Sequence, residues 1–411
     1  MINTHYRGWV EPLIYPMRLG VDETYQWVTD VQTSYDGTEY RKSLRGVPRK
    51  RVTFDIFTKD LQHNQAFVRL YRSFTNPWAV PMWMDATKHN GDIPISSTSI
   101  TLPERNFWFT DESLALIYSS KTKWEVVDVE NYDGQTLNLY AGTTYSHNSP
   151  FIVPISTGRI RGASRNNYKD MSTHGLILEV DDNFIPTYEI MFEDNEWEDV
   201  VLWNSEDYYM NGTVNIFASV ANQYGREVLN RNVASSNGYI NDNNLQANVL
   251  VFDNTRGLRQ QISTWNNSKI DKTFSFVING RRTIDYMRTW LIRLGGQYKE
   301  LWIPSYGSEL SVVSNTVTQT LDVTNFVDSD RKYVGIQKKD YTWFFSEITN
   351  KQNIGEGVTR LTIKDNFNLG MGEINQVTYA GVHRLNSDTL TVKWIDHQSA
   401  SVEIPILEIE G

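Results

Sequence analysis

Apolar and polar residues alternate along several segments of the chain, among them 52–56, 390–394 and 402–404. In the first of these, Val52, Phe54 and Ile56 are separated by single polar residues. This period of two is typical of a strand that buries one face. Turn-forming pairs such as Asp36-Gly37 occur at strand-like intervals. The pattern predicts a mainly β protein.

After two of the strands the period changes from two to 3.6, which predicts a helix at each place. The first helix is expected near 64–75, after the strand at 51–60, and the second near 283–294, after the strand at 271–280. Each has one apolar face, made by Phe67, Leu70, Tyr71 and Phe74 in the first and by Met287, Trp290, Leu291 and Leu294 in the second.

These matching segments indicate an internal repeat. Thr53-Phe54 and Thr273-Phe274 lie 220 positions apart, and the spacing then becomes 219, which matches Trp83 with Trp302 and Trp124 with Trp343. The shared order is a strand, a helix, a tryptophan-containing strand and a hairpin. The sequence therefore predicts two tandem β-sandwich or β-barrel modules, each carrying a short α-helix.

The stretch between the two copies has a different composition. Residues 170–225 contain twelve carboxylates and neither Lys nor Arg, and an Asn-rich stretch follows. We therefore expect a first module at 1–186, a connecting segment or arm at 187–250, and a second module at 251–411.

Two segments of opposite charge are candidates for contacts between subunits, because complementary charges favour specific association. The basic candidates are Arg41, Lys42, Arg45, Arg49, Lys50 and Arg51, and the acidic ones are Glu193, Asp194, Glu196, Glu198 and Asp199. A solvated surface explains the basic run equally well. The acidic segment has a second possible role, as a wall that repels DNA phosphate.

Composition narrows the class of function. The 411 residues carry a formal net charge of -10, which argues against binding of nucleic acid, and include no cysteine, which excludes disulfides and thiolate ligands. The first residues lack the pattern of a signal peptide, and no apolar run approaches the length of a membrane span. We expect a soluble protein made in a bacterial cytoplasm, without a membrane partner.

No motif of a known catalytic class stands out. The chain has no Walker loop, no G-x-S-x-G and no H-E-x-x-H, and its seven histidines lack metal-ligand spacing. The carboxylates at 193–199 could form a glycosidase pair, but they lie on one continuous acidic stretch instead of on separate strand ends. The sequence predicts no catalytic residue, no metal site and no cofactor.

Two segments of the second copy carry a family resemblance. IDYMRTWLIRLGGQYKELWIPSYGSEL at 284–310 and TLTVKWIDHQSASVEIPILEIE at 389–410 resemble the minor tail and tail-tip proteins of long-tailed phages, the distal-tail and baseplate group. The resemblance implies a virion protein that forms a ring, as a trimer or hexamer, at the distal end of the tail tube. Its partners would be the tube, hub and fibre proteins. The alternative is a receptor- or carbohydrate-binding virion module.

Overall fold

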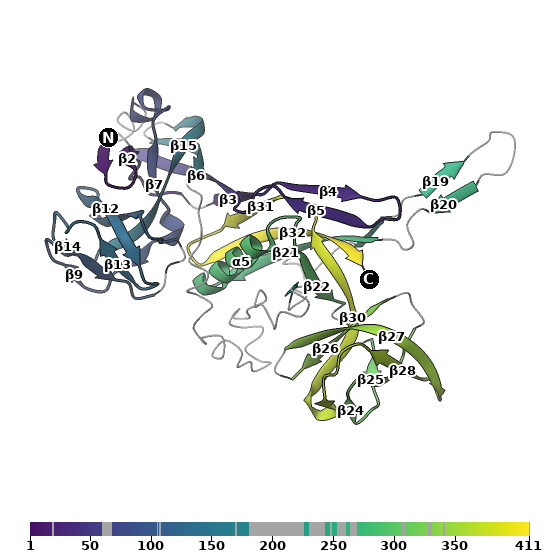
Figure 1. Cartoon of the computed structure of the whole chain (residues 1–411). Coiled ribbons are helices and arrows are strands. Elements are labelled where there is room, and N and C mark those ends of the chain that lie inside the picture. The colour runs from purple at the N-terminus through teal and green to yellow at the C-terminus, as the bar shows by residue number, and fades with distance from the viewer. Residues whose placement is uncertain are drawn as a thin grey trace.

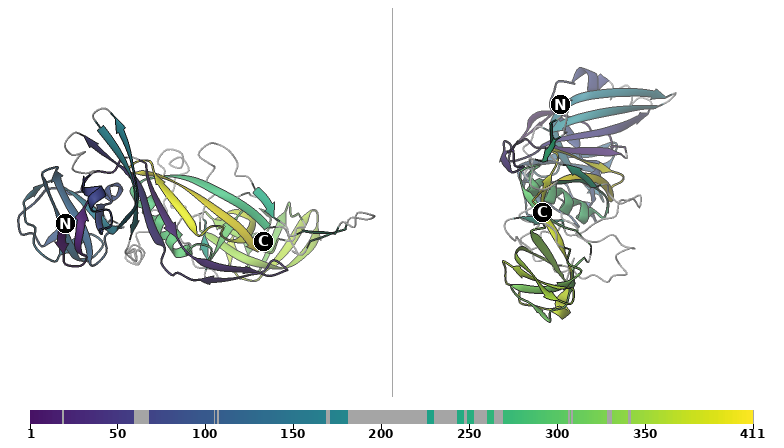
Figure 2. Two further views of the ribbon diagram at one scale, coloured as in Figure 1. Left: turned by 90° about the horizontal axis from the view of Figure 1, so that it is seen from above. Right: turned by 90° about the vertical axis from the view of Figure 1, so that its right-hand side faces the viewer.

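The structure, a computed structural model, describes residues 1–18, 20–59, 68–104, 106, 108–168, 171–180, 226–229, 243–246, 249–252, 260–263, 269–305, 307, 309–327, 331–339 and 342–410. Strands dominate the described residues, so the mainly β class is confirmed. A central sheet runs through the molecule, and two smaller groups of strands lie at its opposite ends (Figure 1, Figure 2).

The central sheet is a continuous run of eight strands, each antiparallel to its neighbours. In spatial order they are β15 (Phe151–Tyr168), β16 (Met171–Val180), β6 (Arg49–Lys59), β3 (Val21–Gln26), β31 (Thr389–Trp394), β32 (Ser399–Glu410), β21 (Lys269–Asn279) and β18 (Asn243–Gln246). The first four come from the first half of the sequence and the last four from the second half. The sheet therefore joins the two halves edge to edge, through β3 and β31.

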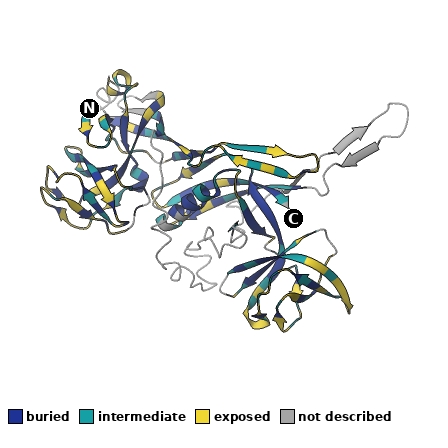
Figure 3. Cartoon of the chain, in the orientation of Figure 1, coloured by how far each residue is buried: buried dark blue, intermediate teal, exposed yellow. Residues whose placement is uncertain are grey.

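Helix α5 (Arg281–Leu294) confirms the helix predicted near 283–294. Gly280 precedes it, and Gly295 ends it in the left-handed conformation with φ 64°, a common helix ending that glycine adopts without strain. The predicted apolar face, which includes Met287 and Trp290, is fully buried (Figure 3). In the first half, residues 68–72 are helical, and the rest of that predicted helix lies partly outside the described residues.

The first half continues from β15 into a second group of strands. Residues 151–158 of β15 pair with β7 (Trp78–Pro81) and β11 (Ser113–Ser120), and β7 lies parallel to β2 (Gly8–Pro12). The group is completed by β1 (Ile2–Thr4), β8 (Thr87–Lys88), β9 (Asp92–Ile93), β10 (Ser99–Thr101), β12 (Lys123–Tyr132), β13 (Thr136–Leu139) and β14 (His147–Asn148).

The second half also has an end group of strands, built on β30 (Ile374–Leu385). This strand pairs with β32, with β22 (Glu300–Pro304) and with β26 (Tyr333–Lys338), and β22 lies parallel to β17 (Glu227–Val228). The other members are β23 (Ser311–Val312), β24 (Thr316–Val317), β25 (Thr320–Thr324), β27 (Trp343–Gly355), β28 (Val358–Ile363), β29 (Leu369–Gly370) and the 3-10 turn η2 (Met371–Glu373). Two strands come from the segment expected to connect the modules: β17 of this group and β18 of the central sheet.

Each half also has a hairpin between corresponding strands of the central sheet. The pair β4 (Thr29–Thr33) and β5 (Glu39–Ser43) lies between β3 and β6 in sequence, with the predicted Asp36-Gly37 turn at its tip. The pair β19 (Val249–Phe252) and β20 (Gln260–Ser263) lies between β18 and β21. Both hairpins extend from the same side of the central sheet (Figure 1).

The predicted match of Trp83 with Trp302 is wrong. Trp302 lies on β22, but Trp83 lies in the 3-10 turn η1 (Trp83–Asp85), because the pairing of β7 with β15 ends at Pro81. The ladders match Trp302 with Ala79 instead, since each is the second residue paired with its parallel neighbour strand. Trp124 and Trp343, by contrast, both lie on strands of the expected hairpins.

One apolar core is shared between the halves. It contains Phe54 and Leu176 from the first half, and Phe276, Trp290 and Ile404 from the second. Separate small cores fill the two end groups, around Phe109 in the first half and Leu361 in the second. The shared core and the eight-stranded sheet position the polar contacts described next.

Candidate functional site

The junction between the two halves is the most elaborate polar site among the described residues. Six residues of β3 pair with six of β31, from Val21 opposite Trp394 to Gln26 opposite Thr389. On this ladder the hydroxyls of Thr24 and Thr391 are hydrogen bonded at 3.0 Å. Strands that are about 370 positions apart in sequence thus form one edge-to-edge contact.

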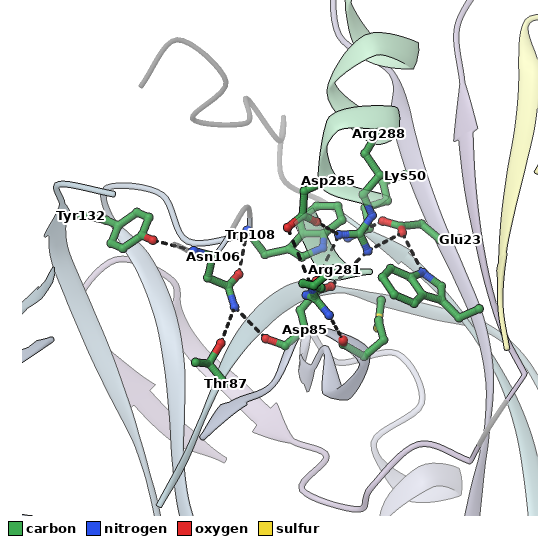
Figure 4. A network of polar contacts seen from close by, with 12 residues as sticks. Glu23, Lys50, Asp85, Thr87, Asn106, Trp108, Tyr132, Arg281, Asp285 and Arg288 are labelled. Carbon is green, nitrogen blue, oxygen red and sulfur yellow. Dashed lines mark hydrogen bonds and ion pairs between the residues drawn. The ribbon is translucent and has the colours of Figure 1, made fainter. Parts of the chain in front are cut away.

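A buried ion network lies behind this ladder, and Arg288 of helix α5 is its centre (Figure 4). The Arg288 guanidinium is 2.9 Å from Glu23 Oε2 on β3 and 3.0 Å from Asp85 Oδ1 in η1. It is also 3.0 Å from Asp285 Oδ1, one turn earlier on the same helix. The side chains of Arg288, Glu23 and Asp85 are all 0% exposed. Helix α5 of the second half is therefore anchored to two elements of the first half.

Two more cations complete the network. Lys50 Nζ on β6 is 3.3 Å from Glu23 Oε1, and Arg281 forms ion pairs with Asp85 and Asp285. The three carboxylates and three cations have no net charge. Balance matters because an unpaired charge in a protein interior costs several kcal/mol of desolvation, which an intact network offsets.

The network shifts the pKa of its members. Burial alone would raise the pKa of Glu23, but the charges of Arg288 and Lys50 outweigh it and lower this pKa to about 2. Burial would likewise lower the pKa of Arg288, whereas the charges of Glu23, Tyr25 and Asp285 raise it. Burial raises the pKa of Asp285, which the two guanidiniums oppose. Glu23 and Arg288 are thus charged across the physiological pH range.

Aromatic rings enclose the cations. Lys50 Nζ lies 2.9 Å from the centre of a Trp108 ring, and the Arg288 guanidinium lies 4.8 Å from Trp108 and 4.4 Å from Trp394. Trp394 also donates a hydrogen bond from Nε1 to Glu23 at 3.2 Å. The rings add cation–π attraction and exclude water from the charges.

Asn106 holds the loop that carries Trp108. Its side-chain amide donates to the backbone oxygen of Asp85 at 2.7 Å and to Thr87 Oγ1 at 3.1 Å, and its side-chain oxygen accepts a hydrogen bond from the backbone N–H of Trp108 at 3.0 Å. Its own backbone N–H donates to the Tyr132 hydroxyl. Trp108 is thereby fixed against the network by the first half of the chain.

A second set of charged contacts joins the hairpin β4–β5 to the second half. Glu39 accepts a hydrogen bond from Arg384 Nε at 2.7 Å and lies 3.3 Å from Lys269 Nζ. Arg41 and Arg226 both pair with Glu300, at 2.5 and 2.6 Å. This hairpin is therefore fastened along the second half of the chain.

The predicted basic residues fall into two groups. Arg41 and Lys50 form ion pairs within the chain, with Glu300 and Glu23. The others have more solvent contact: Arg45 donates to the Gln26 backbone oxygen, Lys42 lies on β5, and Arg49 and Arg51 lie on β6 beside a small cavity lined also by Thr24, Gln26, Glu179 and Thr389. The acidic candidates Glu193, Asp194, Glu196, Glu198 and Asp199 lie outside the described residues.

The sequence contained a signal for two network members that the prediction missed. Glu23 lies at one of the alternating positions of its strand that face the core, between the buried residues Val21 and Tyr25. Arg288 lies on the apolar face of α5, one turn after Ile284. A charged residue at a core position of a periodic pattern indicates a buried partner. Asp85 had no such signal, because it lies in an irregular turn.

Ser119, His147 and Glu125 form a second buried polar arrangement. His147 Nδ1 is 3.0 Å from Ser119 Oγ, and its Nε2 is 2.9 Å from Glu125 Oε1. Glu125 also accepts hydrogen bonds from the backbone N–H groups of Thr144 and Tyr145. These contacts hold the loop before β14 against β12, which is a structural role.

Further features bear on the class of site. Within the described ranges, no cluster of three or more His, Asp or Glu could hold a metal ion, and no helix is both long and apolar enough to cross a membrane. No protein-family model matches the sequence, and no curated protein is significantly similar to it.

Proposed function

We propose that this chain is a structural component of a phage tail tip or baseplate, and that three or six copies form a ring at the distal end of the tail tube. The observation that carries the proposal is the repeat within the central sheet. A unit of four strands, β15–β16–β6–β3, is followed edge to edge by a second unit, β31–β32–β21–β18. A sheet that grows by repeated units at its edges suits a ring.

The equivalent connections support the proposed pair of tandem modules. In each half the third strand of the unit is followed by helical residues and then by a strand with a parallel neighbour: β7 beside β2, and β22 beside β17. A four-stranded antiparallel group comes next, β10–β13–β12–β11 in one half and β25–β28–β27–β26 in the other. Duplication of one module explains these matched orders.

The face of the central sheet opposite the shared core is suited to line a channel. On β6 the residues that alternate with the buried core are Arg51, Thr53, Asp55 and Phe57, and on β21 they include Thr273 and Ser275. Most are polar, as expected for a face in contact with water. The other face carries α5 and the shared core, so the face with these polar residues is the one that we propose for the lumen.

The dimensions agree with such a channel. Three chains would supply three times eight strands, or 24. With strands about 4.8 Å apart and tilted by about 35–45°, the closed backbone ring would be roughly 45–50 Å across. Side chains narrow this bore, which still leaves room for duplex DNA. The proposed partners are accordingly the tail tube, the hub and the fibres, and no reaction is assigned to the chain.

Labelling of virions tests this function. Antibody-gold against the chain should mark the distal end of the tail, and a reconstruction of the tip should show three or six copies around the tail axis. Label on peripheral fibres, or a single copy without a ring, would overturn the proposal. Binding of the purified chain to host cells or to a glycan array would instead favour the receptor- or carbohydrate-binding alternative.

A further inference from the structure

The central sheet ends in two outer strands, β15 at one end and β18 at the other. Each is an end strand of its four-stranded unit, β15 the first strand of one unit and β18 the last strand of the other. Within the described part of the chain, residues 161–168 of β15 pair only with β16, and β18 pairs only with β21. In the middle of the sheet, the last strand of the first unit, β3, pairs with the first strand of the second unit, β31. The two outer strands, β18 and β15, are therefore the same kinds of strand as β3 and β31, which already pair with each other in the middle of the sheet.

The strand ladders show which residues occupy equivalent places. On the second half, Phe276 pairs with Val402, which pairs with Val392 of β31. On the first half, Ile56, 220 positions before Phe276, pairs with His174, which pairs with Arg165 of β15. The outer part of β15 therefore occupies the place of β31.

The other edge is matched in the same way. Tyr25 of β3 pairs with Lys50, and Leu245 of β18 pairs with Ile270. Both members of the second pair lie 220 positions after those of the first, so β18 occupies the place of β3.

The geometry points to a contact between two copies of this chain, in which β18 of one copy pairs antiparallel with residues 162–165 of β15 in the next. Transferring the β3–β31 register places Asn243 opposite Arg165, Asn244 opposite Ser164, Leu245 opposite Ala163 and Gln246 opposite Gly162. This inference deepens the proposed function and rests on its ring, because repeated head-to-tail contacts of one kind close into a ring or extend into a fibre.

Exposure on the first half agrees with a missing partner there. Leu390 and Val392 are 2% and 0% exposed on β31, where β3 covers them. The equivalent part of β15 is exposed at Ala163 and Ser164. An uncovered row of backbone N–H and C=O groups is a template for pairing with another chain.

The helix of the first half provides an independent indication. Arg288 and Leu291 of α5 are both 0% exposed, and Arg288 is buried against first-half residues. At the same 220 spacing from Arg288, Val68 is 42% exposed. Leu70, which is equivalent to Trp290, is buried like Trp290, so this helical segment packs its apolar side against the core of its own half. Val68 thus lies exposed on the side that would meet the next module.

The two kinds of junction differ in charge, which keeps the modules in alternating order. The network residues Glu23, Lys50 and Arg288 are matched at this spacing by Asn243, Ile270 and Val68. A module that carries the buried charges would leave them unpaired against a neutral partner surface, at a cost of several kcal/mol. The charged junction is therefore reserved for the contact within the chain.

Disulfide trapping tests the register, and the absence of cysteine from the chain gives a clean background. The variant Ser164→Cys/Asn244→Cys joins residues expected to be opposite each other in different copies. Oxidation of the purified chain, and of assembled particles, should convert the monomer band on a non-reducing gel into multimers that a reductant reverses. The matched control Thr24→Cys/Thr391→Cys uses the equivalent pair within the chain and should oxidise without multimers.

A second control shifts the register by one residue. Ser164→Cys/Leu245→Cys should not form multimers, because a one-residue slip turns the side chain to the other face of the sheet. If the intrachain pair oxidises but Ser164→Cys/Asn244→Cys stays monomeric in both settings, the contact is overturned. Rings without this cross-link would refute the contact alone, whereas cross-linked multimers with label away from the tail tip would refute the phage-tail function alone.

Discussion

Replacing Arg288 with methionine tests whether the buried network holds the halves together. Methionine preserves much of the side-chain volume, but Glu23, Asp85 and Asp285 then face only Lys50 and Arg281, so one negative charge is uncompensated. Removing one partner from a buried ionic network costs about 3–5 kcal/mol of the free energy of unfolding. The full figure applies because the Arg288 side chain is 0% exposed and contacts all three carboxylates.

A matched control is available on the surface. Arg360 forms a two-point contact with Asp322, at 2.7 and 2.8 Å, but its side chain is 45% exposed. Arg360→Met should therefore cost only about 0–1 kcal/mol. Urea unfolding followed by tryptophan fluorescence measures both variants, since the chain contains 13 tryptophans, among them Trp108 and Trp394 beside the Arg288 guanidinium.

A double-mutant cycle sharpens the result. Adding Glu23→Gln to Arg288→Met restores charge balance, so the double variant should be less destabilised than the sum of the single effects. The reasoning is refuted if Arg288→Met costs no more than Arg360→Met, or if the cycle shows additive effects.

Three further outcomes are expected. The pKa of Glu23, about 2 in the folded protein, lies below its value in the unfolded chain, so the stabilising effect of the ionised Glu23 is complete above about pH 4.5 and is lost as the pH falls toward 2. The difference in free energy of unfolding between the wild type and Glu23→Gln should therefore narrow from about pH 6 to about pH 3. A difference that stays constant over this range would contradict the argument. Gly158→Ala should lose about 1–3 kcal/mol, because the new Cβ would lie 2.2 Å from the Glu179 backbone oxygen, whereas Gly46→Ala meets no atom within 4 Å and should be neutral in the same urea experiment. Arg41→Ala should lower the thermal midpoint more than Lys42→Ala, since Arg41 pairs with Glu300 and Lys42 is exposed; equal midpoints would argue against a role of this ion pair in joining the halves.

Sequence periodicity predicted the regular elements well, because burial on one face leaves a direct pattern. The strand with Val52, Phe54 and Ile56 and the helix around Trp290 are where the pattern places them. The position of Trp83 was missed, since a turn imposes no period. The junction was also missed, because the pairing of β3 with β31 depends on how distant segments meet, and no local pattern encodes it.

The candidate site was predictable in part. The basic run was identified from its charge, but charge alone does not distinguish Lys50, which is 2% exposed, from its exposed neighbours Arg49 and Arg51. The distinction follows from the alternation of side chains along β6, in which every second residue faces the core. Lys50 and Val52 are two of these residues. Charge considered together with this alternation would have distinguished the buried Lys50 from the exposed Arg49 and Arg51.

The pairing of β3 with β31 also has a consequence for how the chain folds during synthesis. Residues 21–26 emerge from the ribosome long before their partners at 389–394, because most of the chain described here lies between them. Contacts of such large sequence separation form slowly, and an unpaired strand edge is prone to association with other chains in the meantime. The edge strand β3 therefore stays unpaired until residues 389–394 have been made, and any factor that shields this edge in the meantime should raise the yield of folded protein.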